Sequence, residues 1–229
     1  MPTITFSNAA VEYDGTTILH PVELSLDEQR IGIIGSNGSG KSTLARLING
    51  LISPTSGSVS YDGLRTDKDG KQIRKRVGFV FSDAESQIIM PRVADDVAFS
   101  LRGRKLSKDE KHSLVQDMLT RFQLESHSDD SPHTLSGGEK QLLALASVLI
   151  LEPETIIADE PTTLLDLRNR RRIAREFAAL EQQLIVVTHD LDLIADFDRV
   201  LVLDNGKVCF DGDAQAAGDF YTARMDVLP

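Results

Sequence analysis

The stretch RIGIIGSNGSGKSTLARLING, residues 30–50, decides the fold of this chain. Its first part, residues 30–34, is a compact apolar run that ends on glycine, which is typical of a buried strand. From Lys41 to about Gly50 the apolar residues recur on one face, which predicts a helix. A strand, a glycine-rich turn and a helix in this order indicate an α/β fold.

The turn between that strand and helix fits the pattern GxxxxGK[ST]. Its glycines allow successive backbone N–H groups to point inward at a phosphate, and the helix N-terminus adds a partial positive charge. Lys41 is predicted to contact the β- and γ-phosphates and Ser42 to offer its hydroxyl to Mg²⁺. An ordinary glycine-rich turn is the alternative, but the strand and the Lys-Ser pair favour nucleotide binding. The predicted nucleotide-binding residues here are Gly35, Ser36, Asn37, Gly38, Ser39, Gly40, Lys41, Ser42 and Thr43.

Two acidic residues and one histidine follow later apolar strand patterns. Asp159 and Glu160 end the run that starts at Thr155, and His189 follows the run 184–187. Asp159 is predicted to hold the hydration shell of Mg²⁺, and Glu160 to polarise the water that attacks the γ-phosphate. His189 is predicted to contact the γ-phosphate, because ligands gather at the carboxyl ends of parallel strands. Lys41, Glu160 and His189 are therefore the candidate catalytic residues.

The pattern along the chain predicts one domain, 1–229, with two attached parts. Short strands over residues 3–26 predict an antiparallel β edge subdomain, and residues 93–149 have helical spacing. Residues 1–92 and 150–229 are predicted to form a parallel-sheet core with that β subdomain, and 93–149 an inserted α-helical subdomain.

Composition excludes several classes of function. The formal net charge of -10 argues against a broad electrostatic grip on nucleic acid, and Cys209, as the single cysteine, excludes an intrachain disulfide. The longest apolar run, 142–151, is shorter than the ~20 residues that span a bilayer, so any membrane crossing is expected from other chains. The arginine-rich helix predicted at 168–180 is interpreted as a solvated face.

Residues 135–141, LSGGEKQ, resemble the LSGGQ signature of the ABC ATPases, and the resemblance extends from about Ile4 to Gly212. In that family two chains sandwich two ATP molecules, and the signature covers the γ-phosphate of the nucleotide bound by the partner. The resemblance implies this role for Ser136, Gly137, Gly138 and Glu139, with Glu139 standing where the family usually has glutamine.

The resemblance implies further roles at single positions. Tyr13 matches the aromatic residue that stacks on adenine, although a strand core residue is the alternative. Leu165 and Asp166 match the loop that joins the two sites across the dimer. Leu164 and Leu167 depart from that loop's pattern, since they replace a small residue and a frequent proline.

Ser82 is the most informative departure from the family pattern. It follows a predicted strand, residues 77–81, and family members usually carry a glutamine directly after that strand. The following segment, with Gln87, looks like that of energy-coupling-factor importers, in which a second glutamine and a short helix form the groove for the membrane partner. Gln87 is therefore assigned to coupling with that partner. Residues 160–173, EPTTLLDLRNRRRI, also look like the biotin branch of these importers.

The resemblance as a whole implies an ATP-hydrolysing subunit that uses ATP and Mg²⁺ at the cytoplasmic face of the inner membrane. Its expected partners are a second ATPase subunit, a transmembrane coupling protein and a substrate-binding membrane protein, with no nucleic acid. A homodimer is expected and a heterodimer stays open. The alternatives are the ATPase of another ABC transporter class, a soluble ABC ATPase that acts on DNA or the ribosome, and a small P-loop kinase.

Overall fold

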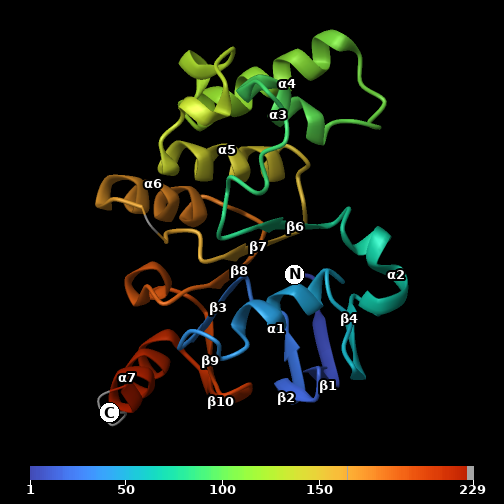
Figure 1. Ribbon diagram of the computed structural model, residues 1–229, viewed down its shortest axis with the longest axis vertical. Coiled ribbons are helices and arrows are strands. Elements are labelled where there is room, and N and C mark those ends of the chain that lie inside the picture. Colours follow the sequence, from blue (N-terminus) through green and yellow to red (C-terminus); the bar gives the residue numbers. More distant parts are fainter. Residues whose placement is uncertain (164, 226–229) are drawn as a thin grey trace.

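The computed structural model describes residues 1–163 and 165–225, and its strands form two sheets (Figure 1). The four-stranded sheet has the order β2-β1-β4-β5 and the six-stranded sheet the order β10-β9-β3-β8-β7-β6. The strands are β1 Ile4–Tyr13, β2 Thr16–Leu26, β3 Arg30–Gly35, β4 Ser56–Tyr61, β5 Leu64–Arg65, β6 Val77–Val80, β7 Thr155–Asp159, β8 Gln183–Val187, β9 Arg199–Asp204 and β10 Lys207–Gly212. The departure noted at Leu164 lies outside the described residues.

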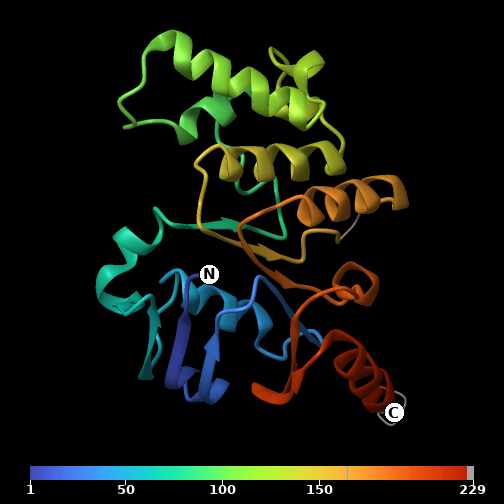
Figure 2. The same ribbon diagram turned by 180° about the vertical axis from the view of Figure 1, so that it is seen from behind.

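Seven α-helices and three short 3₁₀ helices connect or follow these strands in the part of the chain that the structure describes. The α-helices are α1 Lys41–Ile48, α2 Thr66–Ile73, α3 Val93–Ser100, α4 Lys108–Arg121, α5 Gly137–Leu149, α6 Leu167–Ala178 and α7 Ala214–Met225. Short 3₁₀ helices occur at Glu125–His127, Pro132–Thr134 and Leu191–Ile194. Figures 1 and 2 show α3 and α4 farthest from the sheets, with α5 between them and α6. None of the helices in the described ranges combines the length and the apolar character that a bilayer span requires.

The six-stranded sheet is parallel from β9 through β3, β8 and β7 to β6, and β10 joins β9 antiparallel. Successive side chains of a strand point to opposite faces, so each strand contributes to two cores. On β7, Ile156 belongs to the helical-side core and Ile157 to the opposite one, and Leu184 and Ile185 on β8 divide in the same way. Strands buried on both faces read as continuous apolar runs, which explains the sequence pattern.

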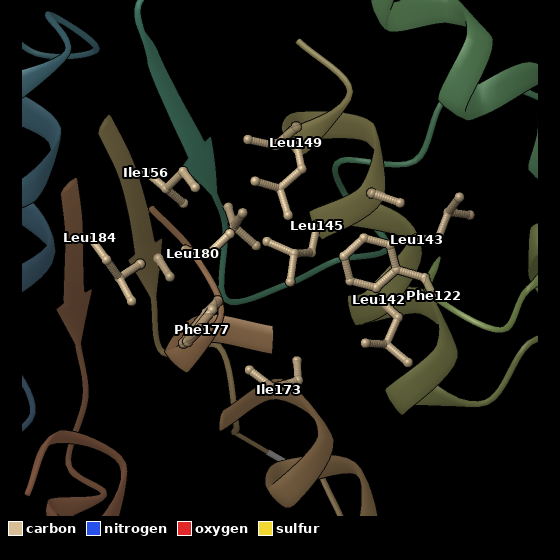
Figure 3. Close-up of a cluster of buried hydrophobic side chains, with 14 of the residues drawn as sticks. Phe122, Leu142, Leu143, Leu145, Leu149, Ile156, Ile173, Phe177, Leu180 and Leu184 are labelled. Atoms are coloured by element: carbon tan, nitrogen blue, oxygen red, sulfur yellow. The ribbon is translucent and has the colours of Figure 1, made fainter. Parts of the chain in front are cut away.

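The helical-side core joins the α3–α5 block to the sheet. Figure 3 shows Leu145 and Leu149 of α5 directed toward Ile156 of β7, with Ile173 and Phe177 of α6 alongside. All five side chains are almost completely buried. The helical block is therefore packed on the sheet through an apolar interface, as the predicted fold class requires.

The opposite core is closed by α1 and the four-stranded sheet, and it contains a buried polar chain. The Tyr61 hydroxyl lies 2.8 Å from Oγ1 of Thr155, which in turn donates to Oε1 of Gln183 at 2.9 Å. Burial is the main reason that the pKa of Tyr61 rises to about 12. These bonds connect the antiparallel sheet to the parallel one.

The predicted α/β fold is confirmed, with differences in the connecting elements. The short strands predicted over residues 3–26 are two long strands, β1 and β2, and the pairing of β1 shifts register near Asn8, a residue with φ of 47°. The sequence pattern did not predict α2, which contains a kink at Asp69, or α7. Ser107 and Glu110 form a capping box at the start of α4.

Candidate nucleotide site

The loop between β3 and α1 curls at glycines that adopt left-handed backbone angles. Gly38 and Gly40 have φ of 78° and 98°. Gly35 has φ of 148°, and a Cβ there would collide with the carbonyl oxygen of Leu203. The loop rests on other strands, because Gly206 N–H donates to the Ser39 carbonyl at 3.1 Å. Glycine is therefore required at Gly35 for the loop to lie this close to β9, and at Gly38 and Gly40 it permits backbone angles that other residues rarely adopt.

The Lys41 side chain bonds back to the first residues of this loop. Its ammonium group donates to the carbonyls of Gly35 at 2.8 Å and Ser36 at 2.9 Å, and the residue is only 6% exposed. Burial lowers the pKa of Lys41, while the carboxylates of Glu160 and Asp159 act in the opposite direction. A buried cation held by backbone carbonyls is well suited to meet an incoming phosphate.

Asp159 at the end of β7 faces the first residues of α1. Its Oδ1 accepts from the Ser42 hydroxyl at 2.8 Å, and its Oδ2 lies 3.5 Å from the guanidinium of Arg46. Burial is the main cause that raises the pKa of the Asp159 carboxyl, and the Ser42 hydrogen bond opposes it. A hydroxyl and a buried carboxylate at this distance are oxygen donors of the kind that Mg²⁺ prefers, so the residues fit the ion.

Glu160 and His189 form a pair beside these groups. Nδ1 of His189 lies 2.8 Å from Oε2 of Glu160, and the Thr163 hydroxyl donates to the same oxygen at 3.2 Å. Glu160 adopts φ of 53°, and its N–H donates to the carbonyl of Val187 at 2.8 Å. This unusual backbone angle turns the chain directly after β7, and the Glu160 side chain meets His189, which lies two residues after β8.

Tyr13 lies at the end of β1, directly before the hairpin turn, with 71% of its surface exposed. This exposure contradicts the alternative of a strand core residue. An exposed aromatic ring is suited to stacking on a base. The β2 strand that follows contacts the loop, since a Cβ on Gly40 would approach the Ile18 carbonyl to 3.0 Å.

The predicted signature residues begin α5. Ser136 and Gly137 are exposed, whereas Gly138 is buried against the side chain of Asn169 on α6. Within the residues that the structure describes, no hydrogen bond joins Ser136 or Gly137 to the 35–43 loop. The signature thus lies at a helix N-terminus that is open to solvent, a position that favours anions.

Glu139 has a local role that the sequence analysis missed. Its Oε2 accepts from the Ser136 N–H at 2.8 Å and the Ser136 hydroxyl at 2.7 Å, and its N–H donates to the Ser136 Oγ at 3.4 Å. These contacts form a capping box, and they lower the pKa of the Glu139 carboxyl. The S-x-x-E spacing is the signal that could have identified it.

Gln87 contacts the free edge of β6. Its Oε1 accepts from the Phe81 N–H and its Nε2 donates to the Phe79 carbonyl, both at 3.1 Å. It also lines a hollow of about 330 Å³ together with Leu51, Phe99 and Leu151. Gln87 is therefore a structural link between this hollow and the strand that leads to Ser82.

The prediction of a solvated basic face on α6 holds for Arg170, which is exposed, but is wrong for Arg172, which is half-buried. Arg172 donates to the Phe122 carbonyl, and Nε of Arg170 donates to the Leu165 carbonyl at 3.1 Å. Asp166 is the N-cap of α6 and accepts from the Asn169 N–H at 2.8 Å, while Leu167 is 63% exposed. A carbonyl partner such as that of Phe122, 50 residues away, cannot be predicted from the charge pattern alone.

Comparisons with known proteins found similar sequences and a similar structure that covers almost the whole chain. The family model described as "ABC transporter" matches residues 19–163. The chain is 48% identical to a biotin transport ATP-binding protein, BioM, of Rhizobium etli, over 93% of this chain and 95% of the relative. It is 38% identical to an energy-coupling factor transporter ATP-binding protein of Halalkalibacterium halodurans, over 80% of this chain and 67% of the relative.

One solved structure is similar over almost the whole chain. The protein cbiO1 of Clostridium perfringens, described as part of the ABC transporter complex cbiONQ, superposes with a TM-score of 0.83 and 31% identity. The alignment covers 97% of this chain and 93% of that one.

Proposed function

This chain belongs to the ABC transporter family as an ATP-binding, ATP-hydrolysing subunit, and from this premise we propose that it is the motor of an energy-coupling-factor importer for biotin. The observation that carries the ATPase part is the grouping of Lys41 near two carboxylates, one of which, Asp159, bonds Ser42, while the other, Glu160, bonds His189. These groups stand at the carboxyl ends of adjacent parallel strands, where such sheets bind ligands.

The reaction we propose is hydrolysis of the γ-phosphate of ATP. Backbone N–H groups of residues 35–43 and the ammonium of Lys41 bind the phosphates, and Tyr13 stacks on adenine. Ser42 and Asp159 would hold Mg²⁺, which neutralises phosphate charge when bound. Glu160 orients the attacking water, and His189 contacts the γ-phosphate while it holds the Glu160 carboxylate in place.

The proposed assembly is a head-to-tail dimer in which each ATP lies between one chain's 35–43 loop and the other's Ser136–Gly138. Support comes from the signature, which is exposed at the start of α5 and makes no hydrogen bond to its own chain's loop within the described residues. Glu139 and the dimer loop, Leu165–Asp166, lie on this side of the interface. ATP favours the closed dimer because each site needs the γ-phosphate for contacts from both chains.

The proposed coupling element is the hollow beside Gln87. Exposed apolar side chains at its rim, Leu51 and Ile89, suit a helix of a transmembrane protein. Residues 93–149 would act as the helical subdomain that moves with this partner, and 1–92 and 150–229 as the core. Gln87 would transmit the movement to β6, whose edge it contacts.

Biotin as cargo is supported by the relatives named for biotin transport, at 48% and 37% identity. The cargo itself would be recognised by a separate membrane protein, joined to this chain through a coupling protein. This arrangement places the chain at the cytoplasmic face of the inner membrane as a peripheral subunit.

Purification of the native protein from gently solubilised membranes tests the proposal. We expect a transmembrane coupling protein and a small biotin-binding membrane protein to co-purify, and ATP to drive uptake of labelled biotin by the complex in vesicles. Uptake of another vitamin by the same complex would reject biotin but keep the importer. A protein that stays soluble and binds no membrane protein would contradict the importer.

A further inference from the structure

The first turn of α6 connects two loops that serve different nucleotides in the proposed dimer. Nε of Arg170 donates to the Leu165 carbonyl at 3.1 Å, and its Nη1 lies 3.8 Å from Oδ2 of Asp190. Leu165 belongs to the dimer loop, whereas Asp190 directly follows His189. One side chain therefore touches the loop that faces the partner and the segment that carries a candidate catalytic residue.

The same turn also holds the signature. A Cβ on Gly138 would collide with the side chain of Asn169, the residue before Arg170. The Asn169 N–H donates to the Asp166 side chain at 2.8 Å. The dimer loop, the signature glycine and the residue after His189 are thus all in contact with two consecutive residues of α6.

The contacts of Arg170 are better suited to positioning than to holding the fold together. The side chain of Arg170 is 44% exposed and that of Asp190 18%, so water screens their attraction. Half-exposed ion pairs contribute little to folding stability. The planar guanidinium, however, donates to the Leu165 carbonyl in a fixed direction and at the same time faces the Asp190 carboxylate, which a compact ammonium group does less specifically. What Arg170 fixes is the position of one loop relative to the other.

We propose that Arg170 is a positioning residue that couples the two nucleotide sites of the dimer. In this inference, which rests on the proposed function, His189 and Glu160 respond to the γ-phosphate of their own chain's ATP. Arg170 passes a shift of the His189–Asp190 segment to the dimer loop and, through Asn169, to the signature that covers the partner's ATP. The coupling runs through direct contacts between named groups, which is the physical requirement for such a connection.

Substitution of Arg170 in the full-length chain tests this inference. Arg170→Met removes both polar contacts and keeps the aliphatic stem, while Arg171→Met makes the same charge change at an exposed neighbour for which the described residues provide no ion pair. We expect Arg170→Met to lower kcat about 3- to 10-fold, the scale of contacts within one network, and to bring the Hill coefficient for ATP toward 1. The KM for ATP and the melting temperature should match those of Arg171→Met.

Two further variants separate positioning from a general structural effect. Arg170→Lys keeps a charge opposite Asp190 and should recover part of the rate. Asp190→Asn should also lower kcat. Because both side chains act through the same contact, the Arg170→Met/Asp190→Asn double variant should be no slower than Arg170→Met alone.

The inference is overturned if Arg170→Met and Arg171→Met hydrolyse ATP with equal kcat and equal Hill coefficients. It is also overturned if Arg170→Met lowers kcat only together with the melting temperature. A wild-type chain that neither binds nor hydrolyses ATP would instead contradict the proposed function, and this inference with it.

Discussion

Nδ1 of His189 lies 2.8 Å from Oε2 of Glu160, so the two candidate catalytic side chains form one unit. An ionised carboxylate only accepts hydrogen bonds, which means that His189 donates through Nδ1. The Thr163 hydroxyl donates to the same Oε2 at 3.2 Å. Both donors therefore engage a single oxygen and leave Oε1 of Glu160 for the water that attacks the phosphate.

Replacement of Glu160 by glutamine tests its role as the group that polarises water. Glu160→Gln keeps the shape of the side chain but removes the basic carboxylate. We expect ATP to bind normally and hydrolysis to slow by at least ~100-fold, the scale of general base catalysis. The variant should accumulate as an ATP-bound dimer, measured by gel filtration with ATP and Mg²⁺. Wild-type turnover would remove Glu160 from the chemistry.

Replacement of Lys41 tests the phosphate loop. The ammonium group of Lys41 contacts the Gly35 and Ser36 carbonyls, and in the proposed complex it contacts the β- and γ-phosphates. Lys41→Ala should lose measurable ATP binding in a nucleotide titration, whereas Lys71→Ala, at an exposed position of α2, should bind like the wild type. Unchanged affinity in Lys41→Ala would show that the loop is misassigned.

Replacement of Gln87 tests the coupling hollow. Gln87→Ala removes the two hydrogen bonds to the edge of β6 and leaves the nucleotide loop untouched. We expect transport in the reconstituted complex to fall more than basal ATP hydrolysis, because the partner's movement no longer reaches β6. Gln72→Ala, an exposed position on α2, provides the control. Equal loss of both activities would favour a direct nucleotide role for Gln87.

The sequence predicted the parts of the site whose residues are neighbours along the chain. The position of Lys41 and Ser42 after the glycines and of two acids at the end of β7 can be read from local patterns, and the fold that these patterns imply is the observed one. Arg170 could not be predicted, since its partner Asp190 lies on another loop and its other partner is a backbone carbonyl. Charge pattern identifies an arginine-rich face but does not tell which side chains turn back toward the protein.

Helices without an apolar stripe were missed for a related reason. In α7, alanine and glycine leave no strong periodicity, although Phe220 of α7 stacks on Phe210 of β10 with ring centroids 5.2 Å apart. In α2, charged residues and the kink at Asp69 conceal a helix that buries Ile73. Tertiary packing stabilises both elements where the local sequence preference is weak.

The capping box of Ser136 and Glu139 predicts a specific response of stability to pH. Hydrogen bonds from Ser136 lower the folded-state pKa of Glu139, so its contribution to stability is complete above the ordinary glutamate value of about 4.3. That contribution is lost as the pH falls through the lowered folded-state value. Glu139→Gln cannot titrate, so its deficit of about 0.3–1 kcal/mol against the wild type at pH 7 should vanish in acid. Urea unfolding at pH 7 and at steps down to pH 3 measures this difference, and a constant deficit would contradict it.

The same carboxylate should also weaken the ATP-bound dimer. In the proposed assembly Glu139 lies in the first turn of the helix whose N-terminus faces the partner's γ-phosphate, and like charges repel across that short distance. Removal of the charge in Glu139→Gln should therefore lower the ATP concentration needed for half-maximal dimer formation, measured by light scattering in the Glu160→Gln background. Glu110→Gln is the matched control, because Glu110 and Ser107 form an equivalent capping box at the start of α4. If both substitutions shift dimer formation equally, the effect arises from total charge, and the signature of α5 does not face phosphate.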